Sequence, residues 1–497
     1  MRYILTAGQM RSGDTRTINE IGVPSMVLME RAALKSVEAM EQEGVDCSRA
    51  LIVCGSGNNG GDGFAVARLL MLKGHAVTVV FAGKEKALSE ETRQQMRILE
   101  NYGVSIGNTI EDGEYSVMVD AIFGIGLTRE VAGGYAEIIF RLNEMTGTKV
   151  ALDIPSGIHA DTGAVMGVAV KADITVAFGC EKLGTILHPG NEYAGKTITA
   201  DIGIDSRMYD GSNEICFAYE KKDIPTLLPE RKEDSHKGTY GKVLMITGSD
   251  GMAGAAYLSA KAAYAMGAGL VQIYTVRENQ TVLQSILPEA IIRTYASFDP
   301  DELHQLIDWA DVAAIGSGLG QGRLASKLVQ ETVSYIKKPC LIDADGLNLL
   351  AGKTQMLKEG NFILTPHLKE MSRLLGKQVK EIKEKRFQIL KEFVQESETI
   401  CVLKDSRTLV AGSENQIYIN TSGNAAMAKA GSGDVLAGVI TGLLAQGQDC
   451  FAAGTAGVYL HGLFGDLARD KKGKYSAAAG DLIDAVGEVL KETEGCE

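Results

Sequence analysis

Short apolar runs alternate along the first part of the chain with segments in which apolar residues recur every three or four positions. The runs have the continuity of strands buried on both faces, and they cover residues 51–57, 76–83, 115–124, 149–157 and 173–179. Helical periodicity is found at residues 8–20, 25–42, 64–74, 91–103 and 136–145. This alternation predicts a parallel sheet with helices on both faces, so we expect a three-layer α/β domain over residues 1–215.

A second alternation follows a charged segment that contains Pro225 and Pro229 and the run ERKEDSHKGTYG, and we expect a linker and domain entry at 216–240. The later apolar runs cover residues 242–249, 270–276, 311–318, 340–346, 362–366, 399–404 and 416–420. Two helices rich in small residues are expected after Gly433. Because no repeat relates the two halves, we expect a different α/β domain at 241–492.

Composition and charge exclude several classes of protein. The 497 residues carry a formal net charge of -13, which argues against a nucleic-acid backbone as main partner, because such binding relies on Lys and Arg. The longest apolar run, 435–445, is far shorter than the roughly 20 residues that cross a bilayer, and the N-terminus lacks a secretory pattern. Eight cysteines without a CxxC pair indicate free thiols in a reducing compartment. We expect a cytoplasmic protein without nucleic-acid or membrane partners, and a homo-oligomer.

The stretch GSGNNGGDG, residues 55–63, follows a strand and opens a helix, and its first six residues satisfy the dinucleotide pattern G-x-G-x-x-G. Two features weaken that interpretation. No acidic residue ends the strand at 76–83, and Asp62 puts a negative charge where a pyrophosphate would lie. Asn58, Asn59 and Asp62 instead suit hydroxyls, amides or a weakly held cation. The alternative is that Asp62 only caps the helix.

Two further strand ends carry acidic residues. Asp120 precedes a second glycine turn, and Asp153 precedes Pro155 and Ser156. The carboxyl ends of neighbouring parallel strands meet at one crevice, so Asn59, Asp120 and Ser156 are candidates for one oxygen-lined ion site, with Asp153 facing a substrate. Taken singly, each Asp is equally well explained as a turn former.

Residues 9–33, 55–70, 119–130 and 151–163 together resemble the N-terminal domain of the NAD(P)H-hydrate repair enzymes, the NAD(P)HX epimerase. The resemblance covers about residues 1–215 and implies a Rossmann-like fold and epimerisation at C6 of NADHX and NADPHX. It implies that K⁺ is held by Asn59, Asp120 and Ser156, and that Asp153 is catalytic. The implied substrate contacts are Asn58, Asn59, Gly60, Gly61, Asp62, Gly124, Ile125, Gly126, Leu127, Thr128, Arg129, Glu130 and Asp153.

A last glycine loop lies within NAAMAKAGSGDVLAG, residues 424–438. Gly431, Ser432 and Gly433 present amides at a helix N-terminus, which is an anion hole for a phosphoryl group. Asp434 lies in the first helical turn, where it can accept a hydroxyl proton as a general base. The alternative is that Asp434 only caps the helix.

Other loops supply further candidates. Lys404 and Arg407 are cations suited to phosphate oxygens, although for those two residues taken alone a solvated surface pair is the favoured interpretation. His367 is a ligand, a base or a satisfied turn histidine, and metal ligation is the least favoured of these. Glu370 is a candidate for orienting Mg²⁺ through water.

The stretches GMAGAA, GSGLG, DADGLNLL, LTPH, VLK and AGSGDVLAG, in this order, resemble the C-terminal dehydratase domain of the same repair family, which is ribokinase-like. The resemblance covers about residues 225–492 and implies ADP-dependent dehydration of (S)-NAD(P)HX with Mg²⁺, releasing AMP and phosphate. The implied substrate contacts are Ala253, Gly318, His367 and Asp434. The implied nucleotide contacts are Lys404, Asp405, Ser406, Arg407, Thr408, Gly431, Ser432 and Gly433. The DSRT after Lys404 departs from the family pattern, which leaves the contacts of Asp405 and Arg407 open.

Two other functions fit parts of the sequence. One is an ATP-dependent small-molecule kinase of the ribokinase superfamily, whose N-terminal half is only a nucleotide-binding or protein-interaction module. The other is a dehydrogenase that uses the loop at 55–63, although Asp62 argues against tight NAD binding there.

Overall fold

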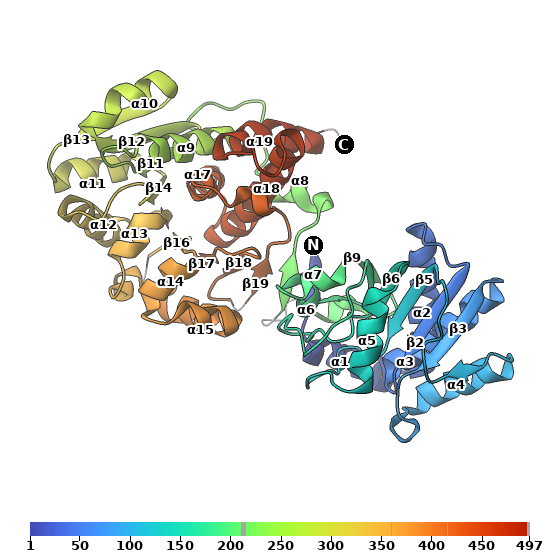
Figure 1. Cartoon of the computed structure of the whole chain (residues 1–497). Helices are drawn as coiled ribbons and strands as arrows, with labels where there is room; N and C mark the ends of the chain where they lie inside the picture. The colour runs from blue at the N-terminus through green and yellow to red at the C-terminus, as the bar shows by residue number, and fades with distance from the viewer. Residues whose placement is uncertain (210–214, 359, 415, 495–497) are drawn as a thin grey trace. The chain divides into compact units, whose positions relative to one another are not determined.

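The computed structural model describes residues 1–209, 215–358, 360–414 and 416–494 (Figure 1). The chain divides into two compact units. The first is Arg2–Ile215, and the second is Cys216–Glu497 together with Met1.

The first unit is built on a parallel sheet with the strand order β4-β3-β2-β5-β6-β7-β9. Its strands are β2 (Arg49–Cys54), β3 (Ala76–Phe81), β4 (Ile106–Gly107), β5 (Val117–Ala121), β6 (Thr148–Leu152), β7 (Ile174–Phe178) and β9 (Lys196–Ala200). The strands β1 (Arg2–Leu5) and β8 (Glu181–Lys182) also pair in parallel with each other. All five predicted strands are confirmed. The order reverses at β2, with β3 on one side and β5 on the other, and ligands bind at such a switch point.

Helices cover both faces of this sheet. The helical segments are α1 (Ala7–Arg16), η1 (Thr17–Ile21), α2 (Ser25–Gln42), α3 (Asn58–Leu72), η2 (Glu85–Ala87), α4 (Glu90–Asn101), α5 (Gly134–Glu144), α6 (Leu183–Ile186), α7 (Asn191–Ala194) and η3 (Ser206–Tyr209). In β2, Ile52 packs in one core cluster with Phe64 of α3, whereas Leu51 packs in another with Ile139 of α5. Successive residues therefore enter opposite layers, which explains the continuous apolar run at 51–57.

The second unit contains a longer sheet with the order β13-β12-β11-β14-β15-β16-β17-β18-β19-β10. Its strands are β10 (Cys216–Ala218), β11 (Lys242–Ile246), β12 (Leu270–Val276), β13 (Ile291–Tyr295), β14 (Val312–Ile315), β15 (Cys340–Ile342), β16 (Phe362–Leu364), β17 (Ile400–Leu403), β18 (Leu409–Ala411) and β19 (Ile417–Ile419). The sheet is parallel except where β18 pairs antiparallel with β17 and β19. Here the order reverses at β11, between β12 and β14.

The helical segments of this unit are η4 (Lys221–Asp223), α8 (Ile224–Leu227), α9 (Ala253–Ala265), η5 (Arg277–Asn279), α10 (Gln280–Ile286), α11 (Pro300–Trp309), α12 (Arg323–Tyr335), α13 (Ala344–Leu349), η6 (Thr354–Leu357), α14 (Leu368–Leu375), α15 (Val379–Glu384), α16 (Arg386–Ser397), η7 (Ala425–Met427), α17 (Ser432–Ala445), α18 (Cys450–Lys472) and α19 (Ala479–Glu494). In Figure 1, α9 and α17–α19 group together, away from α11–α13. A Cβ on Gly438 of α17 would lie 2.1 Å from the Ser259 carbonyl oxygen of α9, so glycine permits the close approach of these helices.

Three further expectations concern the whole chain. The expected linker at 216–240 carries β10, which pairs in parallel with β19, so its first residues belong to the second unit's sheet. The seven cysteines in the described ranges are free and buried, in agreement with the prediction of free thiols. Across those same ranges, no helix has the length and apolar character needed to cross a membrane.

Candidate active sites

A cavity of about 740 Å³ opens at the carboxyl ends of the central strands of the first unit. Among the residues that line it are the predicted Asn58, Asn59, Asp62, Gly124, Ile125, Gly126, Leu127, Thr128, Arg129 and Asp153. Gly60 and Gly61 instead serve packing, since a Cβ on Gly60 would lie 2.0 Å from the Gly55 carbonyl oxygen and one on Gly61 would lie 2.8 Å from the Met29 sulfur. Glu130 is exposed at the end of its loop.

Asn59 is the least satisfied polar side chain of this cavity. It is buried, and neither its Nδ2 nor its Oδ1 has a hydrogen-bond partner among the described residues. A Cβ on Gly124 would lie 3.5 Å from both the Asn59 Cβ and an Asp153 carboxylate oxygen. The structure therefore brings the loops after β2, β5 and β6 together around Asn59. A buried, unpaired amide is costly, and an added ligand or ion would relieve that cost.

Asp120, in β5, and Ser156, after β6, are joined by two hydrogen bonds. Asp120 accepts hydrogen bonds from the Ser156 hydroxyl at 2.6 Å and from the Ser156 backbone N–H at 2.8 Å. Burial raises the pKa of Asp120 to about 6, although these hydrogen bonds oppose the shift.

Asp153 has a buried partner that the sequence did not reveal. Lys182, fully buried in β8, donates to the Asp153 carboxylate and, at 2.8 Å, to the Phe178 carbonyl oxygen. Asp153 itself has a φ of 68°, which is unusual outside glycine. The uncommon backbone conformation and the ion pair with Lys182 thus fix the position of the Asp153 carboxylate. Residues held in sparsely populated backbone conformations cluster at active sites.

Two more carboxylates face the same space. Asp14 of α1 lines the cavity, and burial, followed by the charge of Asp153, raises its pKa to about 6. Burial, with the charges of Asp153 and Asp14, raises the pKa of Asp62 well above its ordinary value. The N-cap of α3 is Gly57, so the interpretation of Asp62 as a helix cap is wrong. The raised pKa also weakens the objection that Asp62 repels a phosphate.

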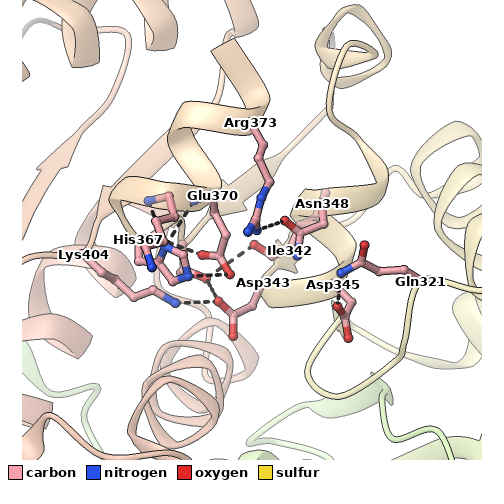
Figure 2. Close-up of polar contacts among 11 residues, drawn as sticks. Gln321, Ile342, Asp343, Asp345, Asn348, His367, Glu370, Arg373 and Lys404 are labelled. Atoms are coloured by element: carbon pink, nitrogen blue, oxygen red, sulfur yellow. Dashed lines mark hydrogen bonds and ion pairs between the residues drawn. The ribbon is translucent and has the colours of Figure 1, made fainter. Parts of the chain in front are cut away.

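The second unit gathers polar side chains from the ends of four adjacent strands, β14 to β17 (Figure 2). Lys404, after β17, donates to the Asp343 carboxylate at 2.8 Å, and Thr365, after β16, donates to the same oxygen at 2.6 Å. Asp343 is buried, and the Lys404 side chain is 19% exposed. The interpretation of Lys404 as one half of a solvated surface pair is therefore wrong.

Asp434 lies against this ion pair. Burial and the Asp343 carboxylate raise the pKa of Asp434 to about 6, while a hydrogen bond with Ser317 and the charge of Lys404 oppose the shift. The N-cap of α17 is Gly431, so the interpretation of Asp434 as a cap is also wrong. A carboxylate with a pKa near neutrality is well suited to accept a proton.

The glycine loop and Lys404 face each other. Gly431 has a φ of 91°, which favours glycine, and a Cβ on Gly433 would lie 3.5 Å from the Lys404 ammonium. The N-terminus of α17 and a half-buried cation thus lie next to each other, which is an arrangement suited to an anion. Gly318, after β14, accepts a hydrogen bond from the Ser249 backbone at 2.6 Å, which places it beside the loop leading to Ala253.

His367 is a helix cap rather than a free ligand. Its Nδ1 accepts hydrogen bonds from the backbone of Lys369 and Glu370, and Glu370 in turn accepts one from the His367 backbone at 2.8 Å (Figure 2). The interpretation as a satisfied turn histidine is therefore correct for Nδ1. The Nε2 lies 3.4 Å from the Glu370 carboxylate. Burial raises the pKa of Glu370 and lowers that of His367.

The 404–408 loop is fixed by side chains rather than left in solvent. Asp405 forms an ion pair with Arg386 of α16 at 3.5 Å, and the Thr408 hydroxyl donates to the Asp405 carbonyl oxygen at 3.1 Å. Arg407 donates to the Ser406 carbonyl oxygen at 3.4 Å. Asp405 is thus an anchor for the loop.

One buried histidine was missed in the sequence. His461 of α18 hydrogen-bonds with the backbone of Ser432, its Nε2 has no partner in the described part of the chain, and burial lowers its pKa to about 4. It is therefore neutral near pH 7 and supports the start of α17 without adding charge. Lys182, Asp14 and His461 could not be identified from the sequence for the same reason. Each is a single polar residue outside any motif, and the groups that it contacts lie far away in the sequence.

Comparisons with known proteins agree with this division. A family described as NAD(P)H-hydrate dehydratase matches residues 243–487, and a family described as YjeF-related protein N-terminus matches residues 25–184. The bifunctional NAD(P)H-hydrate repair enzyme of Moorella thermoacetica is 37% identical to this chain, and the alignment covers 99% of this chain and 97% of that enzyme. That of Escherichia coli is 34% identical, over 97% of this chain and 93% of its own.

Two solved structures are similar to the second unit. The ADP/ATP-dependent NAD(P)H-hydrate dehydratase of Bacillus subtilis, co-crystallised with ATP/Mg²⁺, is 34% identical with a TM-score of 0.50 and covers 55% of this chain and 97% of its own. A ribokinase-like superfamily protein of Enterococcus faecalis is 27% identical with a TM-score of 0.51, over 56% of this chain and 96% of its own. The expectation of a ribokinase-like second domain is confirmed. With both halves matched and relatives aligned over nearly the full length, the chain belongs to the family of bifunctional NAD(P)H-hydrate repair enzymes.

Proposed function

We propose that the chain repairs hydrated nicotinamide nucleotides in two steps. The first unit interconverts the (R) and (S) epimers of NADHX and NADPHX, and the second dehydrates the (S) epimer with ADP, which yields NAD(P)H, AMP and phosphate. One observation carries the proposal: a cavity rich in buried carboxylates and a kinase-like glycine loop occur in one chain that is similar throughout to two-domain repair enzymes. Both units then act on one damaged metabolite.

The first cavity suits inversion at C6 by loss and return of water. Asp14, as the protonated acid, donates to the C6 hydroxyl, the C6–O bond breaks, and the ring nitrogen lone pair stabilises the cation. Water then adds to the opposite face and gives a proton to Asp153, whose carboxylate is oriented by Lys182. Two carboxyl groups that face one cavity are a common arrangement for acid and base.

Replacing Asp14 with Asn is expected to lower epimerisation by roughly 10²-fold, because general acid catalysis is lost. Since the pKa of Asp14 is raised to about 6, the acid form disappears above that pH, so kcat/KM in the parent chain falls as pH rises through about 6. In Asp14→Asn this dependence is absent. Rates of conversion between separated epimers from pH 5 to 8 test it, with exposed Asp112→Asn as control. An unchanged pH profile in Asp14→Asn would contradict the assignment.

The second site suits activation of the hydroxyl by phosphorylation. Asp434 removes the C6 hydroxyl proton, the oxygen attacks the terminal phosphoryl of ADP, and AMP leaves. Phosphate then departs from C6 with its electron pair, the ring nitrogen lone pair assists, and loss of the C5 proton restores the dihydropyridine. The amides of Gly431–Gly433 and the Lys404 ammonium stabilise the transferring group.

Two cations complete the proposal. For K⁺, the unpaired amide oxygen of Asn59 and the hydrogen-bonded pair of Asp120 and Ser156 are oxygen donors at the ends of the neighbouring strands β2, β5 and β6. For Mg²⁺, which usually relies on substrate phosphates and water, Asp343 and Glu370 lie beside Lys404. When bound, Mg²⁺ supplies neutralisation of phosphate charge. The described residues contain no cluster of three or more His, Cys, Asp or Glu suited to a metal.

The whole proposal is tested by giving the purified chain a mixed-epimer hydrate and following the return of nicotinamide absorbance. With ADP we expect both epimers to be converted completely to NAD(P)H, and a parallel assay with ATP compares the two phosphoryl donors. When tetramethylammonium replaces K⁺, we expect conversion of the (S) epimer only. Phosphorylation of ordinary alcohols by ATP without hydrate repair would instead favour the small-molecule kinase. We also expect a cytoplasmic protein and a homo-oligomer, and sedimentation measures the oligomer.

A further inference from the structure

The cavity of the first unit extends well beyond its acidic cluster. Asp153 follows β6, whereas Lys84 follows β3, and both line the cavity. Because β2 and β5 lie between those strands, the two strand ends are about 14 Å apart at the usual spacing of strands. A nucleotide whose hydrated ring lies at Asp153 and which follows the strand ends therefore extends its other nucleoside toward Lys84.

The backbone of Lys84 is held in a defined position. Its N–H donates to the Ser56 hydroxyl at 2.7 Å, and that hydroxyl lies 3.3 Å from the Lys84 carbonyl oxygen. A Cβ on Gly83 would lie 2.3 Å from the Ser56 hydroxyl oxygen, so glycine permits this contact. The loop after β3 is thus tied to the glycine loop at 55–63, which begins the cavity wall.

The ammonium of Lys84 is available to a ligand. The residue is exposed, and no carboxylate of the described chain forms an ion pair with it. Glu91 lines the same end of the cavity, but one of its oxygens accepts a hydrogen bond from the Ser25 hydroxyl at 2.7 Å. The other cations of the lining, Arg11 and Arg129, belong to α1 and to the loop after β5. Lys84 is therefore the cation at the β3 end.

In doubly wound sheets, the end of the strand that follows the glycine-loop helix reads the adenosine ribose. A carboxylate there binds a free 2′-hydroxyl, whereas a nearby cation accommodates a 2′-phosphate. Here that strand is β3, and the residue in question is Lys84. We propose that Lys84 binds the 2′-phosphate, so that the epimerase unit prefers NADPHX to NADHX. This inference rests on the proposed function and concerns only the choice of substrate.

The test compares epimerisation of NADPHX and NADHX by the full chain, without ADP or ATP, so that dehydration does not consume the hydrates. In Lys84→Gln, the ratio of kcat/KM for NADPHX to that for NADHX is expected to fall about 10-fold, because one charge-assisted hydrogen bond is lost. The change should appear in KM for NADPHX, with kcat and both NADHX parameters preserved. Lys84→Arg should retain the preference. The control is Lys86→Gln, an exposed lysine two positions away, which should change nothing.

Each result separates the two levels of the proposal. If both hydrates are epimerised but Lys84→Gln shifts the ratio by less than twofold, or weakens NADHX equally, the assignment of Lys84 is overturned and the repair function stands. An equal change of this ratio in Lys86→Gln also overturns the assignment, because it would show that the preference arises from the general positive charge of this surface rather than from Lys84. If the parent chain epimerises neither hydrate, the proposed function and the inference fail together.

Discussion

Replacing Asp434 with Asn is expected to lower the rate of ADP-dependent dehydration by roughly 10²–10⁴-fold, while epimerisation by the same protein continues at its normal rate. Asparagine has the shape of aspartate and can keep the contact with Ser317, but it accepts no proton from the substrate hydroxyl. The measurement is the return of nicotinamide absorbance from pure (S)-NADHX with saturating ADP. The epimerisation rate of the same sample reports that the first unit is folded, and thermal unfolding reports whether the second unit is folded.

The pH dependence gives this prediction a second readout. A general base must be ionised, and the pKa of Asp434 is raised to about 6, so dehydration by the parent chain should increase as pH rises through about 6. The raised pKa also means that ionised Asp434 destabilises the fold above the ordinary pKa of aspartate, so the Asn variant should be at least as stable near pH 7. Asp470→Asn, an exposed site on α18, is the matched control. Dehydration within a few-fold of the parent rate would contradict the role of Asp434.

The reciprocal result is expected in the first unit. Replacing Asp153 with Asn should lower epimerisation by roughly 10²–10⁴-fold, because the proposed proton acceptor is gone, and leave dehydration of pure (S)-NADHX unchanged. The measurement is conversion of pure (R)-NADHX in the absence of nucleotide. Consumption of mixed epimers faster than their spontaneous interconversion would show that Asp153 is not required.

This substitution also has a structural cost that must be separated from catalysis. Lys182 is fully buried, and loss of its counter-charge is expected to destabilise the first unit by roughly 3–5 kcal/mol. The double variant Asp153→Asn with Lys182→Met removes both charges, so it should recover stability in thermal unfolding but not epimerisation. Recovery of both would mean that Asp153 serves the fold alone.

The strands were well predicted where they are buried on both faces. Ile52 and Leu51 enter different core clusters, so β2 appears in the sequence as an unbroken apolar run, and the residues of β3 and β5 are divided between the same two clusters. The strands β1, β4, β8, β9, β10, β13 and β18 were not predicted. Five of these have only two to four residues, and β9 and β13 lie at sheet edges, where four of the five residues of each are exposed or half-buried. Runs of that kind do not stand out from loops.

The sequence by itself determined the two α/β units, the glycine loops, and Asp153 and Asp434 at the ends of helices or strands, because these follow from local periodicity and turn chemistry. The tertiary structure alone decided what each charge meets. From the sequence, Lys404 resembled a surface cation, but in the fold it forms an ion pair with Asp343, 61 residues away. Lys182 was not a candidate in the sequence, and in the fold it forms an ion pair with Asp153. The proton affinity of a carboxylate depends on burial and on neighbouring charges, both of which arise only when distant segments pack together.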